Sequence, residues 1–122
     1  MPAAFSATLR PSLFRWLAVL SLLVNAVLIL MPQPPSVPLF PYEDKVVHLV
    51  LFGAPAAFGL LAGWRARVLL PGLFAYAVAT EVIQGTLESA TRSGSVGDLI
   101  ADAVGIGSGW IVARLMARHT GQ

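Results

Sequence analysis

Four apolar segments follow one another along this chain of 122 residues, at about 13–31, 46–64, 68–87 and 96–115. Each is long enough to cross a bilayer, because a hydrocarbon core needs roughly 20 mostly apolar residues in a helix. Lipid offers no partner to backbone N–H and C=O groups, so a spanning segment must bond them internally. The pattern therefore predicts an all-α membrane protein, a bundle of four transmembrane helices.

The composition supports this reading. Hydrophobic residues make up 57% of the chain and charged residues 11%, against roughly 45–50% and about 25% in soluble domains. A small soluble protein of this composition would expose much apolar surface to water, whereas a bilayer removes that problem. The chain has no cysteine, which excludes disulfides, thiolate catalysis and cysteine-ligated zinc.

The first segment has an alternative interpretation as a signal peptide, because Val24, Asn25 and Ala26 form a faint cleavage pattern. The apolar run continues to Met31, which favours a retained anchor. A proline-rich stretch follows, and we expect it to be extended and polyproline-like. Its prolines are Pro32, Pro34, Pro35, Pro38 and Pro41.

Basic residues indicate how the helices are oriented. Six of the eight lie in or next to the N-terminal arm, in the turn between the second and third segments, or near the C-terminus: Arg10, Arg15, Arg65, Arg67, Arg114 and Arg118. Positive charge in short loops marks the cytoplasmic side, so both termini are expected to be cytoplasmic. The arginines form no continuous stripe, and no nucleic-acid partner is expected.

This orientation divides the chain into five parts. They are a short cytoplasmic N-terminal arm (1–12), an anchor helix (13–31), a proline-rich outer loop (32–43), a three-helix membrane domain (44–115) and a cytoplasmic tail (116–122). The expected location is the plasma (inner) membrane of a bacterium, crossed several times.

The acidic residues gather at the opposite, outer helix ends: Glu43, Asp44, Glu81, Glu88, Asp98 and Asp102. Asp44 and Ser95 are predicted to cap the second and fourth helices. Glu81, Asp98 and Asp102 lie inside apolar segments, where charge is costly and usually pairs, faces a cavity or carries function. A helix-capping role is enough to explain Asp98 when it is considered by itself. Capping does not explain a carboxylate in the middle of a segment, such as Glu81.

Counting residues gives the depth of each polar side chain. At about 1.5 Å per residue, His48, Gln84 and Asp98 are expected roughly 5 Å below the outer surface, and Glu81 and Asp102 roughly 9 Å below it. Two carboxylates at one depth should not both stay charged, so either one is protonated or a cation holds them. That cation would be Arg92, Lys45, a protonated His48 or a bound metal.

The fourth segment carries its acids and its glycines on one face. Asp98, Asp102, Gly105 and Gly109 follow each other at spacings of three or four residues, which share a helix face. Small residues spaced in this way let helices approach closely in lipid. The packing face is therefore expected to hold the carboxylates inside the bundle, with the first helix serving mainly as an anchor.

Taken together, these motifs resemble the VanZ-like family of bacterial membrane proteins over roughly 43–113. The resemblance rests on DKVVH (Asp44 to His48), EVIQG (Glu81 to Gly85), an arginine and DLIADAVG (Asp98 to Gly105), followed by Gly109. Asp102 stands where asparagine is commoner in the family. The family's motif residues fall on Asp44, Lys45, His48, Glu81, Gln84, Arg92, Asp98 and Asp102.

The resemblance implies a multi-pass protein of the bacterial envelope, in a family whose namesake is associated with low-level teicoplanin resistance. It transfers no catalytic residues. We expect a non-enzymatic protein, without cofactor or metal, whose outward-facing polar pocket binds an envelope glycan, a lipid-linked ligand or a membrane-protein partner. A homo-oligomer is compatible with these features.

Two other classes of function stay open. In a membrane-embedded enzyme, His48 with Asp44 or Asp98 would be an acid/base pair, while Lys45 and Arg92 would grip the phosphate of a lipid-linked substrate. One variant of that enzyme holds a metal through His48, Glu81 and Asp98. In a proton or ion transporter, Glu81 and Asp102 would relay a proton.

Overall fold

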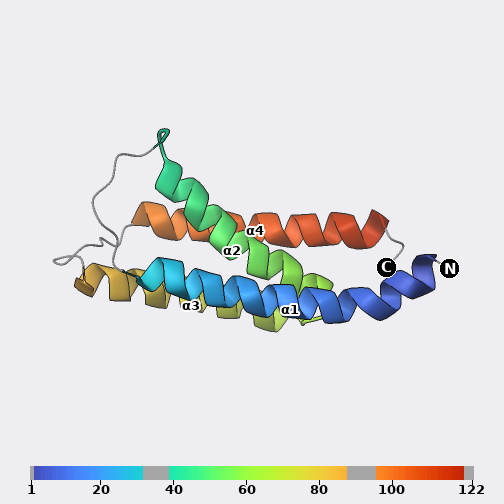
Figure 1. Ribbon diagram of the computed structural model, residues 1–122. Coiled ribbons are helices and arrows are strands. Elements are labelled where there is room, and N and C mark those ends of the chain that lie inside the picture. Colours follow the sequence, from blue (N-terminus) through green and yellow to red (C-terminus); the bar gives the residue numbers. More distant parts are fainter. Residues whose placement is uncertain (1, 32–38, 88–95, 120–122) are drawn as a thin grey trace.

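The computed structural model describes residues 2–31, 39–87 and 96–119, and over these residues the chain is helical apart from short connections. The helices are α1 (Pro2–Leu30), α2 (Glu43–Leu61), α3 (Ala66–Leu87) and α4 (Val96–His119) (Figure 1). All four are long and apolar enough to cross a membrane. The start of α1 and the end of α4 lie at the same end of the bundle.

Helix α1 is longer than the sequence predicted. It begins at Pro2, so residues 2–12 of the predicted arm are helical, and the part apolar enough to span a membrane is Pro11–Leu30. Proline is favoured in the first turn of a helix, where its missing N–H has no helical partner to lose. The proline-rich stretch 32–38 and the segment 88–95 lie outside the described residues.

Large apolar side chains cover the outside of the bundle. Those more than half exposed on the first three helices include Leu20, Leu23, Val27, Val50 and Val82. An apolar surface of this extent would be a liability in water. It is the surface expected of a multi-pass membrane protein.

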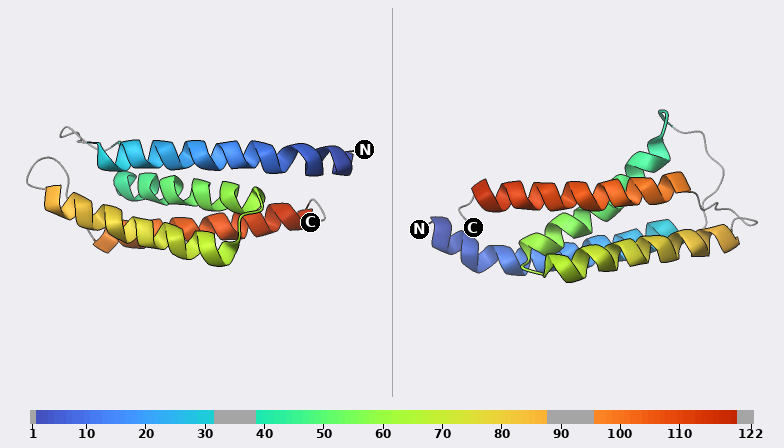
Figure 2. Two further views of the ribbon diagram at one scale, coloured as in Figure 1. Left: turned by 90° about the horizontal axis from the view of Figure 1, so that it is seen from below. Right: turned by 180° about the vertical axis from the view of Figure 1, so that it is seen from behind.

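Helix α2 is the centre of the arrangement. It lies between α1 on one side and α3 and α4 on the other (Figure 2), and it is inclined to the other three helices (Figure 1). Its most extensive contacts are with α4 and α1. The core formed by the four helices contains Ile29, Phe52, Ala56, Leu73, Ala77 and Ile106.

Glycine allows α2 and α4 to touch through their backbones. A Cβ added at Gly105 would overlap the carbonyl oxygen of Leu49, and a Cβ at Gly109 would overlap that of Gly53. A Cβ at Gly53 would lie 3.0 Å from the carbonyl oxygen of Gly105. Lipid provides no hydrophobic driving force for helices to associate. Close packing through small residues stabilises the helix pair by van der Waals contact instead.

A buried asparagine fixes α1 against α2 and α3. The Asn25 side-chain amide donates a 2.8 Å hydrogen bond to the backbone oxygen of Leu51, and its Oδ1 accepts a 2.8 Å bond from the Tyr76 hydroxyl. In a regular helix the Leu51 oxygen would accept from residue 55, but Pro55 has no N–H. Asn25 therefore satisfies the carbonyl that Pro55 leaves without its helical donor.

A second polar bond joins α1 to α3. Gln84 Nε2 donates a 2.8 Å bond to the backbone oxygen of Ile29, one of the last four carbonyls of α1, which have no donor within the helix. We expected the first helix to serve mainly as an anchor. The structure adds that Asn25 and the end of α1 bond to α2 and α3 through buried groups.

The predicted cap of α2 was wrong. The N-cap is Tyr42, in a left-handed conformation with φ 63° and without a side-chain capping bond. Asp44 lies in the first turn beside Glu43, where acidic groups suit the helix dipole. Glu43 instead accepts a hydrogen bond from the backbone N–H of Leu39, which ties the first turn to the chain before it.

The turn from α2 to α3 depends on Gly63. Its φ is +94°, and the N–H of Trp64 bonds back to the oxygen of Gly59 at 3.0 Å. This pattern is a Schellman motif, in which a glycine in the left-handed region ends the helix. The helix therefore ends at Leu61, before the predicted boundary at Trp64.

Candidate functional site

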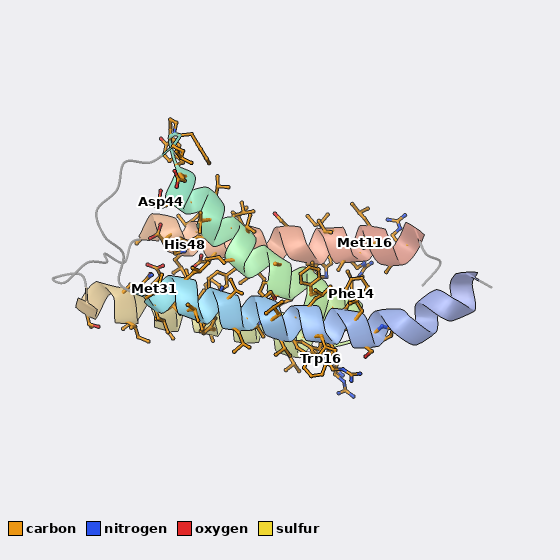
Figure 3. The ribbon with its side chains drawn as sticks, viewed as in Figure 1. Phe14, Trp16, Met31, Asp44, His48 and Met116 are labelled. Atoms are coloured by element: carbon orange, nitrogen blue, oxygen red, sulfur yellow. The ribbon has the colours of Figure 1, made fainter. Side chains whose placement is uncertain are left out.

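The candidate site is a polar cluster at the end of the bundle where α2 and α4 begin and α3 ends (Figure 3). His48 comes from α2, Glu81 from α3, and Asp98 and Asp102 from α4. Lys45, one turn before His48, completes the cluster at its outer edge. The arginines at the end of α4, Arg114 and Arg118, lie at the opposite end of that helix.

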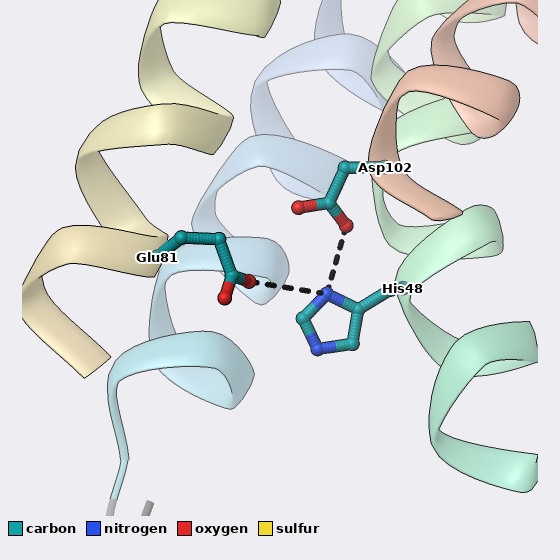
Figure 4. Close-up of side chains that lie close together, drawn as sticks. All are labelled: His48, Glu81 and Asp102. Atoms are coloured by element: carbon teal, nitrogen blue, oxygen red, sulfur yellow. Dashed lines mark hydrogen bonds and ion pairs between the residues drawn. The ribbon is translucent and has the colours of Figure 1, made fainter. Parts of the chain in front are cut away.

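His48 is the centre of the cluster. Its Nδ1 is 2.8 Å from Asp102 Oδ1 and 4.0 Å from Glu81 Oε1 (Figure 4), and its Nε2 is 3.8 Å from Asp98 Oδ2. The side chains of His48, Glu81 and Asp98 are 5%, 10% and 10% exposed. One imidazole thus faces three carboxylates, with two of them near the same nitrogen.

Asp102 is the most deeply buried member. Its side chain is fully buried, and only Oδ1 contacts His48. Its other oxygen, Oδ2, receives no hydrogen bond from the residues that the structure describes. Leaving a buried acceptor without a donor costs on the order of 1–3 kcal/mol, and more for a charged group.

Lys45 connects the cluster to the surface. Its ammonium group is 2.7 Å from Asp98 Oδ1 and 2.6 Å from Asp44 Oδ2. Asp44 is mostly exposed, so it marks the outer rim, whereas Asp98 links Lys45 to His48. The charged side chains therefore form a continuous path from the end of the bundle to Asp102.

The helix positions explain why His48 and Asp102 meet. We expected His48 in a shallower tier than Glu81 and Asp102, counting from a second segment that begins at 46. Because α2 begins at Glu43, His48 is its sixth residue, while Asp102 is the seventh of α4. The two side chains therefore lie at one level and belong to a single tier.

Of the other predicted site residues, Gln84 and the two glycines lie outside the cluster. Gln84 is buried, and its side-chain amide donates to the backbone oxygen of Ile29 on α1. Arg92, Glu88 and the predicted cap Ser95 lie outside the described residues. Gly105 and Gly109 lie in the contact between α2 and α4, farther from the start of α4 than the acidic residues on that helix.

Sequence reasoning missed the Asn25–Tyr76 pair, which supports the site by fixing α1 against the helices that carry it. An amide inside an apolar segment of about 20 residues is itself a signal, because such a group must find a partner in lipid. Pro55 was a second signal, since it leaves one carbonyl of α2 to be satisfied from outside the helix.

The cluster is suited to holding a positively charged group. Carboxylate oxygens and an unprotonated imidazole nitrogen bind protons, accept hydrogen bonds from ammonium groups and coordinate metal ions. Comparisons of the chain with protein-family models, with curated proteins and with solved structures gave no match. The VanZ-like resemblance therefore stays a prediction from the motifs.

Proposed function

We propose that this chain is a VanZ-like protein of the bacterial plasma membrane, with both termini in the cytoplasm and the polar cluster beneath the extracytoplasmic surface. The distribution of charge supports this orientation. Arg65, Arg67, Arg114 and Arg118 are all exposed at the end opposite the cluster, and arginine in short loops marks the cytoplasmic side.

The proposed role is to bind a polar or charged envelope ligand, such as a glycan or a lipid-linked group, without chemical conversion. The observation that carries this role is the buried His48–Asp102 contact of 2.8 Å, joined to the outside through Asp98 and Lys45. Ionisable groups inside apolar helices are costly and usually serve a function. Tolerance to a teicoplanin-type glycopeptide, or envelope integrity, is the expected phenotype.

Cysteine labelling tests the orientation directly, because the natural chain has no cysteine. Single variants Leu39→Cys and Arg118→Cys would be treated in intact spheroplasts with a membrane-impermeant maleimide. We expect position 39 to react and position 118 to react only after lysis. The reverse pattern, or reaction at both sites before lysis, would contradict the proposed topology.

Alanine variants test the binding role. His48→Ala and Glu81→Ala should each abolish the glycopeptide-tolerance or envelope phenotype in cells that depend on this protein. Thr80→Ala is the matched control: Thr80 is as buried as the cluster, but its hydroxyl donates to the Ala77 carbonyl one turn away in the same helix. A phenotype that survives both cluster variants would refute the role.

The His48–Asp102 geometry also favours a second candidate, a membrane-embedded enzyme acting on a lipid-linked phosphorylated substrate. A histidine oriented by a carboxylate is a common general base. Lys45, half-buried at the rim, would hold the phosphate. Turnover of undecaprenyl phosphate or pyrophosphate by purified protein, lost in His48→Ala and kept in Thr80→Ala, would favour this candidate; absence of turnover would dismiss it.

A further inference from the structure

We propose that His48, Glu81 and Asp102 form a binding site for a divalent metal ion of the zinc class. This inference names a ligand for the polar cluster and rests on the proposed function for its location beneath a membrane surface. The sequence led us to expect no metal in the non-enzymatic protein. In the enzyme variant that holds a metal, the expected ligands were His48, Glu81 and Asp98, whereas the structure replaces Asp98 with Asp102.

The geometry of the donors supports the site. One donor atom from each of the three residues lies within 4.8 Å of the other two, and the residues come from three different helices (Figure 4). Metal–ligand bonds of about 2.0–2.2 Å in a tetrahedral zinc site place the donors roughly 3.3–3.6 Å apart. His48 Nδ1 is 4.0 Å from Glu81 Oε1 and 2.8 Å from Asp102 Oδ1, so a bound ion requires Glu81 to move closer to His48 and the Asp102 oxygen to move slightly away.

Asp102 gives an independent reason for a cation. A carboxylate with no exposure to solvent keeps one oxygen, Oδ2, without a hydrogen bond from any described residue. Buried carboxylates of this kind are normally paired or coordinate metals. A metal ion between Asp102, Glu81 and His48 would occupy this free acceptor.

Asp98 prepares the histidine for coordination. A histidine that binds a metal through one nitrogen commonly directs its other N–H to a carboxylate, which fixes the tautomer. His48 Nε2 faces Asp98 Oδ2 at 3.8 Å, while Nδ1 faces Asp102 and Glu81. Lys45 holds Asp98 in place from the other side at 2.7 Å. Asp98 and Lys45 are therefore positioning residues and do not contact the metal.

The donor set indicates the class of ion. One imidazole and two carboxylates suit zinc and also manganese, whereas the absence of thiolates disfavours copper(I). Three protein ligands leave a coordination position open. An oxygen of a polar envelope ligand would bind at that position, which connects metal binding with the proposed role.

Metal analysis tests the site in the intact chain. The full-length protein would be purified in detergent, with its affinity tag removed, stripped with a chelator and titrated with Zn²⁺ alone. We expect one zinc per chain by elemental analysis after desalting. Titration with Co²⁺ should give visible absorption bands of a low-symmetry nitrogen–oxygen site, which zinc then removes.

Variants identify the ligands. His48→Ala, Glu81→Gln and Asp102→Asn should each lose stoichiometric zinc, while Asp98→Asn should weaken the affinity about 10–100-fold, as loss of an orienting group does. Thr80→Ala should bind like the natural protein. Circular dichroism of the helices distinguishes a variant that has lost zinc binding from one that has lost its fold. The zinc content of the natural chain tests the site without any substitution.

The outcomes separate this inference from the proposed function. A folded natural chain that retains no zinc, or retention of full zinc in both His48→Ala and Asp102→Asn, overturns the metal site. If His48→Ala still abolishes the envelope phenotype, the proposed binding role survives that result. Stoichiometric zinc in a protein whose phenotype is unaffected by the cluster variants supports the metal site and refutes the role.

Discussion

Asn25 on α1 donates its hydrogen bond to the backbone oxygen of Leu51 on α2, at 2.8 Å, four residues before Pro55. The proline deprives that oxygen of its helical donor, and the asparagine replaces it from a neighbouring helix. The same side chain accepts from Tyr76 on α3. A single amide therefore joins three helices next to the core.

Asn25→Leu should destabilise the bundle. The change leaves the Leu51 carbonyl and the Tyr76 hydroxyl without their partner in the apolar core. Interhelical hydrogen bonds in membrane proteins are worth about 0.6 kcal/mol on average and up to about 1.7, so we expect a loss of about 1–2 kcal/mol for the two bonds. Reversible unfolding in mixed micelles, followed by circular dichroism, measures it.

Pro55 provides the control for this prediction. In a Pro55→Ala background, residue 55 regains an N–H, and α2 can satisfy the Leu51 carbonyl itself. Asn25→Leu should then cost less than it does in the natural chain, with a coupling of at least about 0.5 kcal/mol in a double-mutant cycle. Strict additivity would show that Asn25 does not compensate for the proline.

Gly105→Ala should weaken the contact between α2 and α4. The added methyl group would overlap the carbonyl oxygen of Leu49, and overpacking of this kind typically costs about 1–3 kcal/mol. The same unfolding measurement gives the loss.

Gly107→Ala is the matched control on the same helix. A Cβ at Gly107 meets no atom within 4 Å, and alanine favours a helix over glycine by about 1 kcal/mol. Gly107→Ala should therefore be neutral or stabilising. Equal effects of the two substitutions would refute the close backbone contact at Gly105.

Lys45→Met and Asp98→Asn should be coupled. The ammonium group lies 2.7 Å from a carboxylate that is only 10% exposed, so each single change removes a charge-assisted hydrogen bond. Residues in direct contact show interaction energies of about 0.5–3 kcal/mol, and the double variant should be less destabilised than the sum of the two single variants. A coupling energy below the experimental error would contradict an energetic contribution of the Lys45–Asp98 ion pair to the cluster.

Gly63→Ala should destabilise the turn between α2 and α3. Its φ of +94° lies where a Cβ is strained, and the left-handed region costs other residues about 1–2 kcal/mol. Gly72→Ala, inside α3 and with free space around its Cβ, is the comparison. An equal, small effect at both positions would contradict the Schellman motif.

The helices were predictable because apolar segments of bilayer length have few alternatives. Each predicted segment overlaps one of the helices α1–α4. The boundaries were less accurate, since they depend on backbone geometry such as φ at Tyr42 and Gly63, which composition does not reveal. With the start of α2 at Glu43, His48 is the sixth residue of its helix and Asp102 the seventh of α4, so the two side chains are closer in depth than the predicted boundaries implied.

The polar cluster was predictable only in part. Helical spacing placed Asp98 and Asp102 on one face with Gly105, and the structure puts that face against α2. The partner of the Gln84 side chain was not predictable, because Gln84 and Glu81 share a helix face and either side chain could point to His48. Only the position of α1, fixed through Asn25, shows that a terminal carbonyl of that helix is the partner of Gln84.

Asn25 and Gln84 recognise main-chain oxygens, and every amino acid carries such an oxygen. Leu51 and Ile29 can therefore be replaced during evolution by other apolar residues of similar size while the hydrogen bonds that hold α1 against α2 and α3 are kept. The amides themselves have no such freedom, and in related chains Asn25 should persist wherever Pro55 does and become dispensable where the proline is replaced.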